Sequence, residues 1–354
     1  MSRPAAGIPP AWRFRGALGP ALRRGGLVAL PVGLAALADL FLEDAYAAGL
    51  ATGALVDGFA AFDAPARIRV RWQLLIAPLI GASAAIGVLS SQATITAALA
   101  MAAIGGLAGL CFAVSARLMI AGLTCSLALL LAQGFYLEPA DAPEALVLGT
   151  AGGLLQAAAA LAALVFSDRA PGRWSLGEAA RGSVATMRAN LTLASSALRH
   201  GIRFGTALGL GVAFYRVVDL GEHGYWVPLT ILFVLRPFRD ETLERLAMRA
   251  AGTVVGLALA TGLAAMLGEQ PVPTAIVLAV AAAFSYALLA IEYALFTTAI
   301  TTYVVLLTDS LGTPPIEAAD ERGLATAIGI VIAGAAFVAW GEGAGPDCSR
   351  AARR

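Results

Sequence analysis

The sequence predicts an all-helical protein with about twelve membrane-spanning helices, and three observations carry this prediction. Of the 354 residues, 59% are hydrophobic and 13% are charged, and the mean hydropathy is +0.80. Soluble domains are usually about 45 to 50% apolar and about 25% charged. The apolar residues also form long runs, and a helix needs about 20 such residues to cross a bilayer. Finally, the arginines collect in alternate gaps between these runs.

The apolar runs divide the chain into two halves of six predicted spans. We expect the first six at residues 25–42, 45–62, 72–90, 93–114, 118–137 and 144–166. The second six are expected at 201–219, 224–236, 247–268, 271–290, 293–310 and 321–341. The predicted organisation is an N-terminal segment (1–24), a membrane repeat (25–167), a linker (168–200), a second membrane repeat (201–341) and a tail (342–354).

The arginines predict the orientation, because cytoplasmic loops of membrane proteins are enriched in basic residues. Arginines precede the first span, separate spans 2 and 3, 4 and 5, and 8 and 9, fill the linker and end the chain. All these positions fall on one side of the predicted membrane, whereas the opposite loops are mostly acidic. Arg216 and Arg322 are exceptions near the acidic side. We therefore expect both termini and the linker in the cytoplasm.

The two halves resemble each other as a duplicated pair. An offset of 179 residues pairs Gly26 with Gly205 and Tyr46 with Tyr225, and an offset of 175 pairs Gly81 with Gly256. Six spans in each half is an even number, so both halves enter the membrane from the same side. The prediction is two parallel repeats related by a pseudo-two-fold axis along the membrane normal.

The linker has the spacing of one amphipathic helix. Apolar residues recur at steps of three and four from Leu176 to Leu198, and Arg181 and Arg188 lie off this stripe. Both a simple connector and an element lying on the anionic inner leaflet fit the pattern.

Small residues predict where helices approach closely. Gly252, Gly256 and Ala260 recur every four residues, and such ridges let helix backbones pack tightly in a membrane. The same spacing occurs at Gly105 with Gly109 and at Gly149 with Gly153. We expect all three ridges to serve helix packing.

Two corresponding spans are interrupted, which indicates a candidate substrate path. Span 2 contains three glycines, and span 8 contains Pro228 and is followed by Pro237. A proline removes a backbone donor, and paired broken segments are the best sequence pointer to a translocation site. The candidate path residues are Arg216, Asp219, Tyr225, Trp226, Pro228, Thr230 and Arg236. Interfacial aromatic residues beside a kinked helix would explain the same residues.

Charges near the hydrocarbon need an explanation because they are costly there. Arg216 and Asp219 are one turn apart, so they either pair or leave Arg216 facing the path, where it would favour anions. Glu292 is either a helix-terminus residue or a proton-coupling carboxylate, and Asp39 also lies near a span end. Further along, Glu241, Arg245 and Arg249 recur every four residues, which predicts a solvated ion-pair stripe.

Signatures of enzymes and metal sites are missing from the sequence. It contains no GxSxG, HExxH or Walker A pattern, and His200 and His223 are its only histidines. The three cysteines, Cys111, Cys125 and Cys348, have no CxxC spacing and are expected as free thiols. We expect no catalytic residues, no metal, no cofactor and no nucleic-acid partner.

Residues 224–260 resemble the fusaric acid resistance family, which is grouped with aromatic acid exporters. The shared pattern is Tyr225-Trp226, Pro228-Leu229-Thr230, Val234, Arg236-Pro237, Thr242, Arg245, Arg249 and Gly252-Thr253-Val254-Val255-Gly256. The resemblance implies a bacterial inner-membrane exporter of aromatic or other organic acids, with the lipid bilayer and a small organic anion as partners. A second copy of the chain or an efflux complex would be the candidate protein partner.

The chain departs from larger members of that family, which carry a soluble cytoplasmic domain between the halves. Its first half also lacks the motif, since Ala47 stands at the position of Trp226 and Asp57-Gly58 at that of Arg236-Pro237. An anion channel and a non-transporting scaffold of an efflux or envelope complex are therefore alternative functions.

Overall fold

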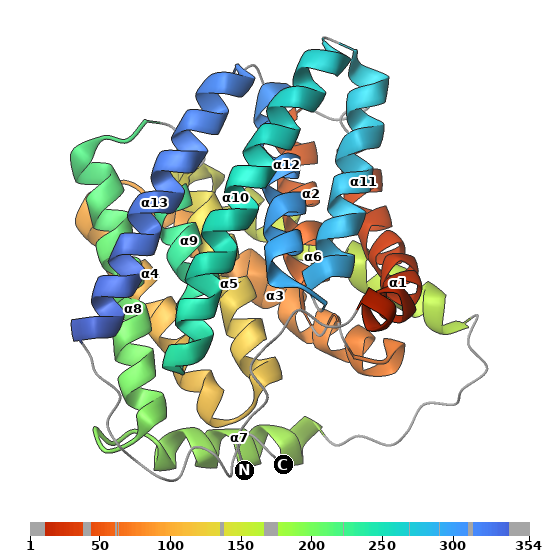
Figure 1. Ribbon diagram of the computed structural model, residues 1–354. Coiled ribbons are helices and arrows are strands. Elements are labelled where there is room, and N and C mark those ends of the chain that lie inside the picture. Colours follow the sequence, from red (N-terminus) through yellow and green to blue (C-terminus); the bar gives the residue numbers. More distant parts are fainter. Residues whose placement is uncertain are drawn as a thin grey trace.

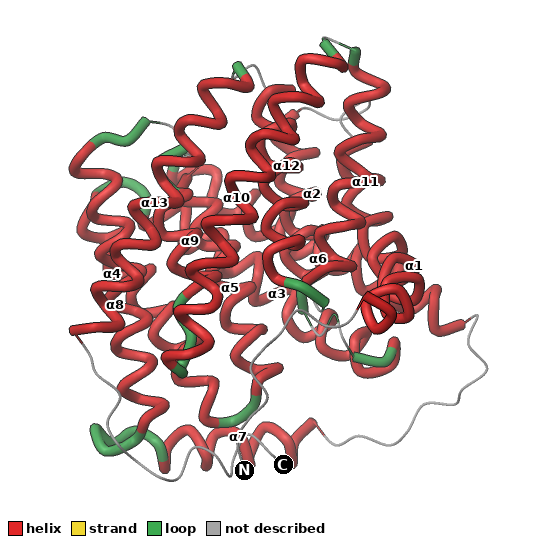
Figure 2. The backbone as a smooth tube through the Cα atoms, in the orientation of Figure 1, coloured by secondary structure: helices red, strands yellow, loops and turns green. Residues whose placement is uncertain are grey.

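The computed structural model describes residues 11–37, 44–60, 62, 64–134, 138–165, 176–221, 223–268, 270–289, 291–310 and 314–339, and its regular elements there are all helices (Figures 1 and 2). In chain order they are α1 (Ala11–Leu37), α2 (Asp44–Gly58), α3 (Ala66–Ser90), α4 (Thr94–Leu110), α5 (Ala116–Gly134), α6 (Ala142–Val165), α7 (Leu176–Ala189), α8 (Ser196–Val218), α9 (Trp226–Val234), α10 (Arg239–Leu267), α11 (Pro271–Leu289), α12 (Tyr293–Ser310) and α13 (Pro315–Ala339). Short 3-10 turns follow α4 at η2 (Cys111–Ala113) and precede α6 at η3 (Pro139–Asp141).

The prediction of an all-helical membrane protein is confirmed for the described chain, but the expected number of crossings is not. Each of the twelve predicted segments overlaps a helix. Six helical stretches are long and apolar enough to span a membrane, namely Ala66–Ser90, Thr94–Ala113, Ala116–Gly134, Pro139–Ala162, Asp240–Leu267 and Pro315–Ala339. Two shorter apolar stretches are Ile276–Leu289 and Tyr293–Asp309. By length and composition, six stretches of the described chain can therefore cross a membrane, and the arrangement of twelve spans is not confirmed.

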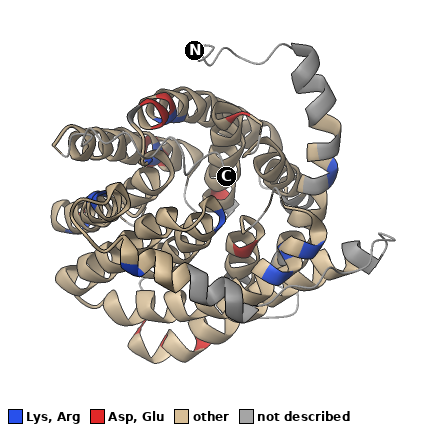
Figure 3. Cartoon of the chain, turned by 90° about the horizontal axis from the view of Figure 1, so that it is seen from below, with Lys and Arg blue, Asp and Glu red and all other residues tan. Residues whose placement is uncertain are grey.

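The outer surface of the bundle is apolar. Large hydrophobic side chains such as Leu99, Met266 and Val338 are 64%, 82% and 81% exposed. Charged residues are sparse on the helices seen from below (Figure 3). Such an extensive exposed apolar surface is characteristic of a protein that lies in lipid.

Apart from the linker helix α7, two helices are too short to cross a bilayer, and they occupy corresponding places in the two halves. Helix α2 has 15 residues and α9 has 9. At about 1.5 Å per residue, α9 extends only about 14 Å, compared with about 30 Å of hydrocarbon. The two segments that the sequence identifies as interrupted are thus the short helices of the bundle.

Close helix packing occurs where the small residues lie. A Cβ atom built on Gly256 of α10 would lie 2.7 Å from Cβ of Thr301 on α12. The hydroxyl of Thr302 on α12 donates to the Gly256 carbonyl over 3.3 Å. The backbone of Gly149 on α6 likewise lies against Gly81 on α3. An ideal Cβ on Gly149 would lie 3.0 Å from the Cα of Gly81.

The two halves meet along two helix pairs. Helix α4 packs along α8, and α1 packs along α11. In the first pair, an ideal Cβ on Gly109 would lie 2.8 Å from the Cα of Gly201. Each pair joins the fourth helix of one half to the first helix of the other. The largest buried cluster continues across this junction, from Met101 of α4 to Leu208 of α8.

The linker contains a shorter helix than the sequence predicts. Helix α7 lies across the lower end of the bundle and ends at Ala189 (Figure 1). Helix α8 then starts at Ser196, capped by the Ser195 hydroxyl, which accepts a hydrogen bond from the Ala197 amide over 3.2 Å. A single helix through residue 198 is therefore wrong, because the polar side chains of Asn190 and Ser195 bond each other between the two helices, 2.8 Å apart.

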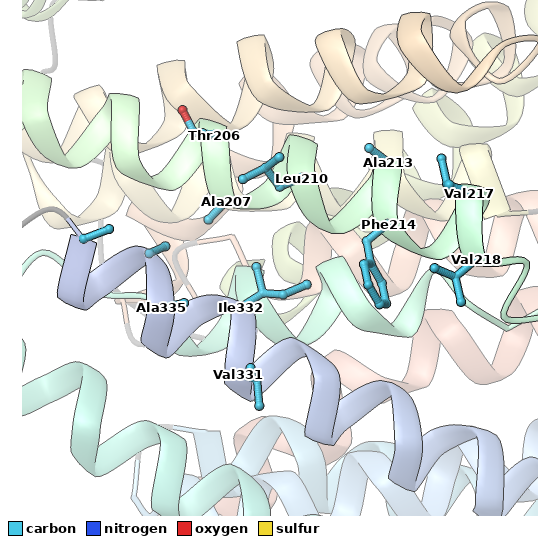
Figure 4. A pocket seen from close by; sticks show the side chains of 12 residues that line it. Thr206, Ala207, Leu210, Ala213, Phe214, Val217, Val218, Val331, Ile332 and Ala335 are labelled. Atoms are coloured by element: carbon cyan, nitrogen blue, oxygen red, sulfur yellow. The ribbon is translucent and has the colours of Figure 1, made fainter.

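A groove of about 590 Å³ lies on the surface between α8 and α13. Figure 4 shows Phe214, Leu210 and Val217 of α8 together with Val331 and Ile332 of α13 around it. The lining contains no charged residue. This groove suits hydrocarbon, such as a lipid tail, and offers nothing to a carboxylate.

Candidate anion-binding site

The site is built around the turn that joins α9 to α10. Helix α9 ends at Val234, and Leu235 has extended backbone angles of −70° and 118°. Pro237 explains this ending, because the residue before a proline is disfavoured in helical conformation. The hydroxyl of Thr242, in the first turn of α10, accepts from the Arg236 amide over 3.0 Å and contacts the Arg236 carbonyl at 3.2 Å. Thr242 thereby fixes Arg236 in place.

Arg203 of α8 supports the same turn from the other side. One of its terminal nitrogens donates to the carbonyls of Arg236 and Pro237 over 3.0 and 3.1 Å. Its guanidinium carbon also lies 4.7 Å from the ring centre of Phe337 on α13. The turn is therefore held by α8, α10 and α13 together, which positions the Arg236 side chain precisely relative to α10.

Replacing Thr242 by valine should loosen this turn. Valine has a similar shape but leaves the buried Arg236 amide without its acceptor, so we expect a loss of about 1 to 3 kcal/mol of stability. Thermal unfolding of the purified protein measures it. Thr261→Val is the matched control, because the Thr261 hydroxyl bonds only the Leu257 carbonyl of its own helix among the hydrogen bonds seen. Equal unfolding temperatures for both variants would show that Thr242 does not hold the turn.

Four arginine side chains gather along α10 and its neighbours, and we call them the arginine column. Arg236 lies in the turn, Arg245 and Arg249 lie one helical turn apart on α10, and Arg322 comes from α13. Arg249 and Arg322 are each 1% exposed. The charge of Arg245 acts on Arg236, and that of Arg249 acts on Arg322. The column thus brings together like charges that repel one another.

Aromatic rings provide most of the contacts that the column makes. The guanidinium carbon of Arg245 lies 4.4 Å from the ring centre of Tyr293, and that of Arg322 lies 4.9 Å from Trp226. Arg249 lies 5.9 Å from the ring centre of Phe233. Cation–π contacts of this kind contribute about 0.5 to 2 kcal/mol each. They offset only part of the cost of burying a cation.

Several N–H groups of the column have no protein acceptor among the described residues. These are Nε of Arg236, Nη1 of Arg245, Nε and Nη2 of Arg249, and Nε and Nη1 of Arg322. None of the four side chains forms an ion pair within the described part of the chain. A buried charge normally has a partner, so a column of unpaired guanidinium groups is suited to an anion that binds from outside the chain.

A cavity of about 390 Å³ lies beside the column, where the two halves meet. Arg236 and Arg245 provide its charged wall, and the rings of Phe59, Phe62 and Phe233 provide an aromatic wall. The remaining lining residues are Ile120, Leu123, Thr124, Leu127, Leu232 and Leu289. None of these described lining residues is a carboxylate. This size and this combination of apolar walls with few polar groups are typical of small-molecule sites.

A second polar cluster closes the column at its far end. Nδ1 of His223 lies 2.6 Å from Oε2 of Glu321, which joins the start of α9 to α13. The imidazole also stacks on Trp226, with ring centres 4.5 Å apart and planes at 23°. Trp226 therefore contacts both His223 and Arg322 and lies between the column and the end of the bundle.

The part of the chain that contains the arginine column resembles known proteins. Residues 204–336 match a family model described as fusaric acid resistance protein-like. This part of the chain is therefore similar to that family. The resemblance predicted from residues 224–260 is thus confirmed, and the fusaric acid resistance-like region contains all four arginines of the column, whereas Phe59 and Phe62 lie outside it.

Relatives of the fusaric acid resistance-like chain are much longer than the matched regions. Inner membrane protein YccS of Escherichia coli K12 is 34% identical over 148 residues, which are 42% of this chain and 20% of YccS. The uncharacterized protein slr1298 of Synechocystis is 32% identical over 150 residues, with the same two shares. An uncharacterized Neisseria gonorrhoeae protein is 35% identical over 71 residues, 20% of this chain and 17% of that protein. The alignments thus span about a fifth of each relative. No solved structure matches the chain.

The predicted path residues divide into two groups in the structure. Trp226 and Arg236 belong to the column or contact it, as described above. Pro228 packs near Gly211 of α8, and the Thr230 hydroxyl donates to the Trp226 carbonyl of its own helix over 3.0 Å. Tyr225 packs against Gly134 of α5. These three residues shape and position α9.

Arg216 and Asp219 lie apart from the column. Arg216 donates to the Ser91 carbonyl over 2.7 Å and so joins α8 to the turn after α3. Asp219 is exposed and has a positive φ of 54° at the end of α8. The two side chains form no ion pair with each other in the described structure. Glu292 accepts from the Ala294 amide at the start of α12 over 3.3 Å, a helix-terminus role, and Asp39 lies outside the described residues.

The expected ion-pair stripe on α10 is wrong for Arg249, because α9 and α13 cover that face of the helix. Sequence reasoning did not assign Arg245, Arg249 and Arg322 to the path. The available signal was Arg322, a single basic residue on the acidic side that follows Asp320 and Glu321 directly, at the start of an apolar run.

Proposed function

We propose that this chain is a multi-pass inner-membrane transporter that exports small organic anions, aromatic carboxylates above all. The fusaric acid resistance-like region and the inner-membrane location of YccS support the class and the membrane. The observation that carries the proposal is the cavity with two unpaired guanidinium groups on one wall and phenyl rings on the other. A planar carboxylate is bound well by a guanidinium group, and phenyl rings suit an aromatic body.

The column defines the proposed route through the protein. An anion would bind between Arg236 and Arg245, pass to Arg249 and Arg322, and leave past Trp226 and the His223–Glu321 pair. At each stage an unpaired guanidinium group replaces part of the hydration of the carboxylate. Trp226 would have to move to let the anion pass.

We further propose that the helices form two parallel repeats of six, with the α7 end facing the cytoplasm. The matching positions of the short helices α2 and α9 support the repeat, as do the reciprocal pairs α4 with α8 and α1 with α11. The arginine-rich gaps support the orientation. In this arrangement the cavity lies between the repeats and opens toward the cytoplasm.

Flux of benzoate, a simple aromatic carboxylate, tests the function. The full chain reconstituted in liposomes should move radiolabelled benzoate, and Arg245→Gln should reduce the rate roughly 10- to 100-fold, because a hydrogen bond to a charged group contributes about 1.5 to 3 kcal/mol. Arg117→Gln is the control, since Arg117 is exposed at the start of α5.

Each other outcome of this experiment has a distinct meaning. An ohmic current carried by benzoate without saturation of the rate would identify a channel instead of a transporter. No flux and no benzoate binding by a folded chain would overturn the proposal and favour a scaffold. Equal rates for Arg245→Gln and Arg117→Gln would remove the cavity from the route.

A further inference from the structure

Asp57 is a buried carboxylic acid in the first half of the chain. It is the penultimate residue of α2, is 0% exposed, and neither Oδ1 nor Oδ2 has a hydrogen-bond partner in the described structure. Removing an ionised carboxylate from water without a counter-ion costs several kcal/mol. Burial therefore favours the neutral acid over the carboxylate at this position, and an acidic residue buried within a membrane bundle is a candidate functional site.

No cation on the described helices forms an ion pair with Asp57. On α3, Nε2 of Gln73 donates to the Asp57 backbone carbonyl over 3.4 Å. On α6, an ideal Cβ at Gly153 would lie 3.6 Å from the Asp57 Cβ. The titratable groups on which the Asp57 charge acts are the Cys125 thiol on α5 and the Tyr286 hydroxyl on α11. Both are neutral in their ordinary state, so nothing in this shell holds the carboxylate in its charged form.

A water-sized space lies next to this shell. A cavity of about 10 Å³ is lined by Arg69, Gln73 and Gln156 together with apolar residues. The side-chain oxygens of Gln73 and Gln156 are buried without a partner among the described groups. This volume is close to that needed for one water molecule, and buried waters satisfy such polar atoms. Gln73 thus lines this water-sized space and also bonds the backbone carbonyl of Asp57.

Asp57 also lies close to the proposed anion cavity along the chain. Phe59, two residues later, lines that cavity, and the Tyr286 ring packs on Phe59 with ring centres 4.9 Å apart. In a medium of low dielectric constant, a negative charge on Asp57 opposes a carboxylate in the cavity. A proton on Asp57 removes this repulsion. By linkage, a bound anion must then favour the proton to the same extent.

We infer that Asp57 is a proton-binding site that couples proton binding to the binding of an organic anion in the cavity. The inference rests on the proposed function and adds its energy coupling. One proton passes from water to an Asp57 carboxylate oxygen as the anion binds, and returns to water when the anion leaves. The chain therefore carries the pair as an electroneutral acid, and net export follows the outward gradient of that acid.

The test measures benzoate affinity and proton exchange on the full chain in lipid nanodiscs. The Kd of the wild-type chain for benzoate should rise with pH in the range where Asp57 of the free chain ionises, by up to about tenfold per pH unit if one proton is linked. Titration calorimetry in buffers of different ionisation enthalpy should show net proton uptake on binding. Asp57→Asn should bind benzoate with a flat pH dependence and no proton uptake. Asp57→Glu should restore both, and Asp320→Asn, at an exposed position of α13, should behave as wild type.

The outcomes separate this inference from the proposed function. If the wild-type chain binds benzoate without proton uptake, or if Asp57→Asn keeps the wild-type pH dependence, the coupling is overturned and the anion site stands. If the wild-type chain does not bind benzoate, both fall.

A measurement on the wild-type chain covers the case in which Asp57→Asn does not fold. Dicyclohexylcarbodiimide reacts with protonated carboxyl groups in apolar surroundings, and mass spectrometry locates the adduct. Benzoate should increase labelling of Asp57 severalfold at a pH where this side chain is mostly ionised in the free chain, since the bound anion favours the protonated acid. Labelling of Asp57 that does not change with benzoate would overturn the inference.

Discussion

Replacing Arg249 by methionine should reduce benzoate flux by at least about tenfold without lowering the stability of the protein. The two effects have one cause. Arg249 is 1% exposed, forms no ion pair in the described chain and leaves Nε and Nη2 without acceptors. Methionine keeps the length and the apolar contact with Phe233 and removes an uncompensated charge. Exchanging buried charged groups for apolar residues of similar volume is often neutral or stabilising by about 1 to 4 kcal/mol.

The combination of lost flux and retained stability separates an anion site from a structural contact. If Arg249 only braced α10 against α9, its removal would lower the unfolding temperature and the flux together. We therefore expect an unfolding temperature equal to or above wild type, measured by the amount of monodisperse protein left after heating. Arg117→Met, at an exposed position, is the control for charge removal. An unfolding temperature well below that of Arg117→Met would show that Arg249 serves folding.

The positions of the helices could be predicted from the sequence because they depend on local information. Hydropathy along 20 residues decides whether a segment can be buried in lipid, and each of the twelve expected segments does overlap a helix. The glycine ridges could be predicted for a similar reason. Glycines spaced four residues apart in an apolar run let the backbone of another helix approach closely. The twelve crossings are not confirmed, because only six described stretches have the length and hydropathy of a membrane span and short helices such as α9 do not.

The site was predictable only in part, because the burial of a polar side chain depends on what other elements cover it. The motif around Trp226 and Arg236 indicated the correct region. Arg249 lies four residues after Arg245, a spacing that solvated residues on a helix surface also have. Nothing near Arg249 in the sequence shows that α9 and α13 cover it. Phe59 lines the cavity from the other half of the chain, more than 170 residues from Arg236. Local patterns carry no information about such contacts.

Gly205→Leu should prevent stable folding, since it changes the seam that joins the two halves. An ideal Cβ on Gly205 of α8 would contact the Ala102 carbonyl and lie 2.9 Å from the Cα of Gly106, both on α4. These are backbone atoms, which cannot rotate away as a side chain can. Overpacking commonly costs about 1 to 3 kcal/mol, and a leucine against backbone should lie at or above the upper end of that range.

The predicted duplication supplies the control for this experiment. The sequence offset pairs Gly205 with Gly26 on α1, but an ideal Cβ on Gly26 meets nothing within 4 Å. The neighbouring Gly25 instead contacts the Ala283 carbonyl of α11. Gly26→Leu should therefore give normal amounts of folded protein after detergent extraction, while Gly205→Leu gives aggregated or degraded protein. Similar yields of folded protein from both variants would mean that α4 and α8 are not packed as closely as the structure has them, and that the cavity between the halves is held by other contacts.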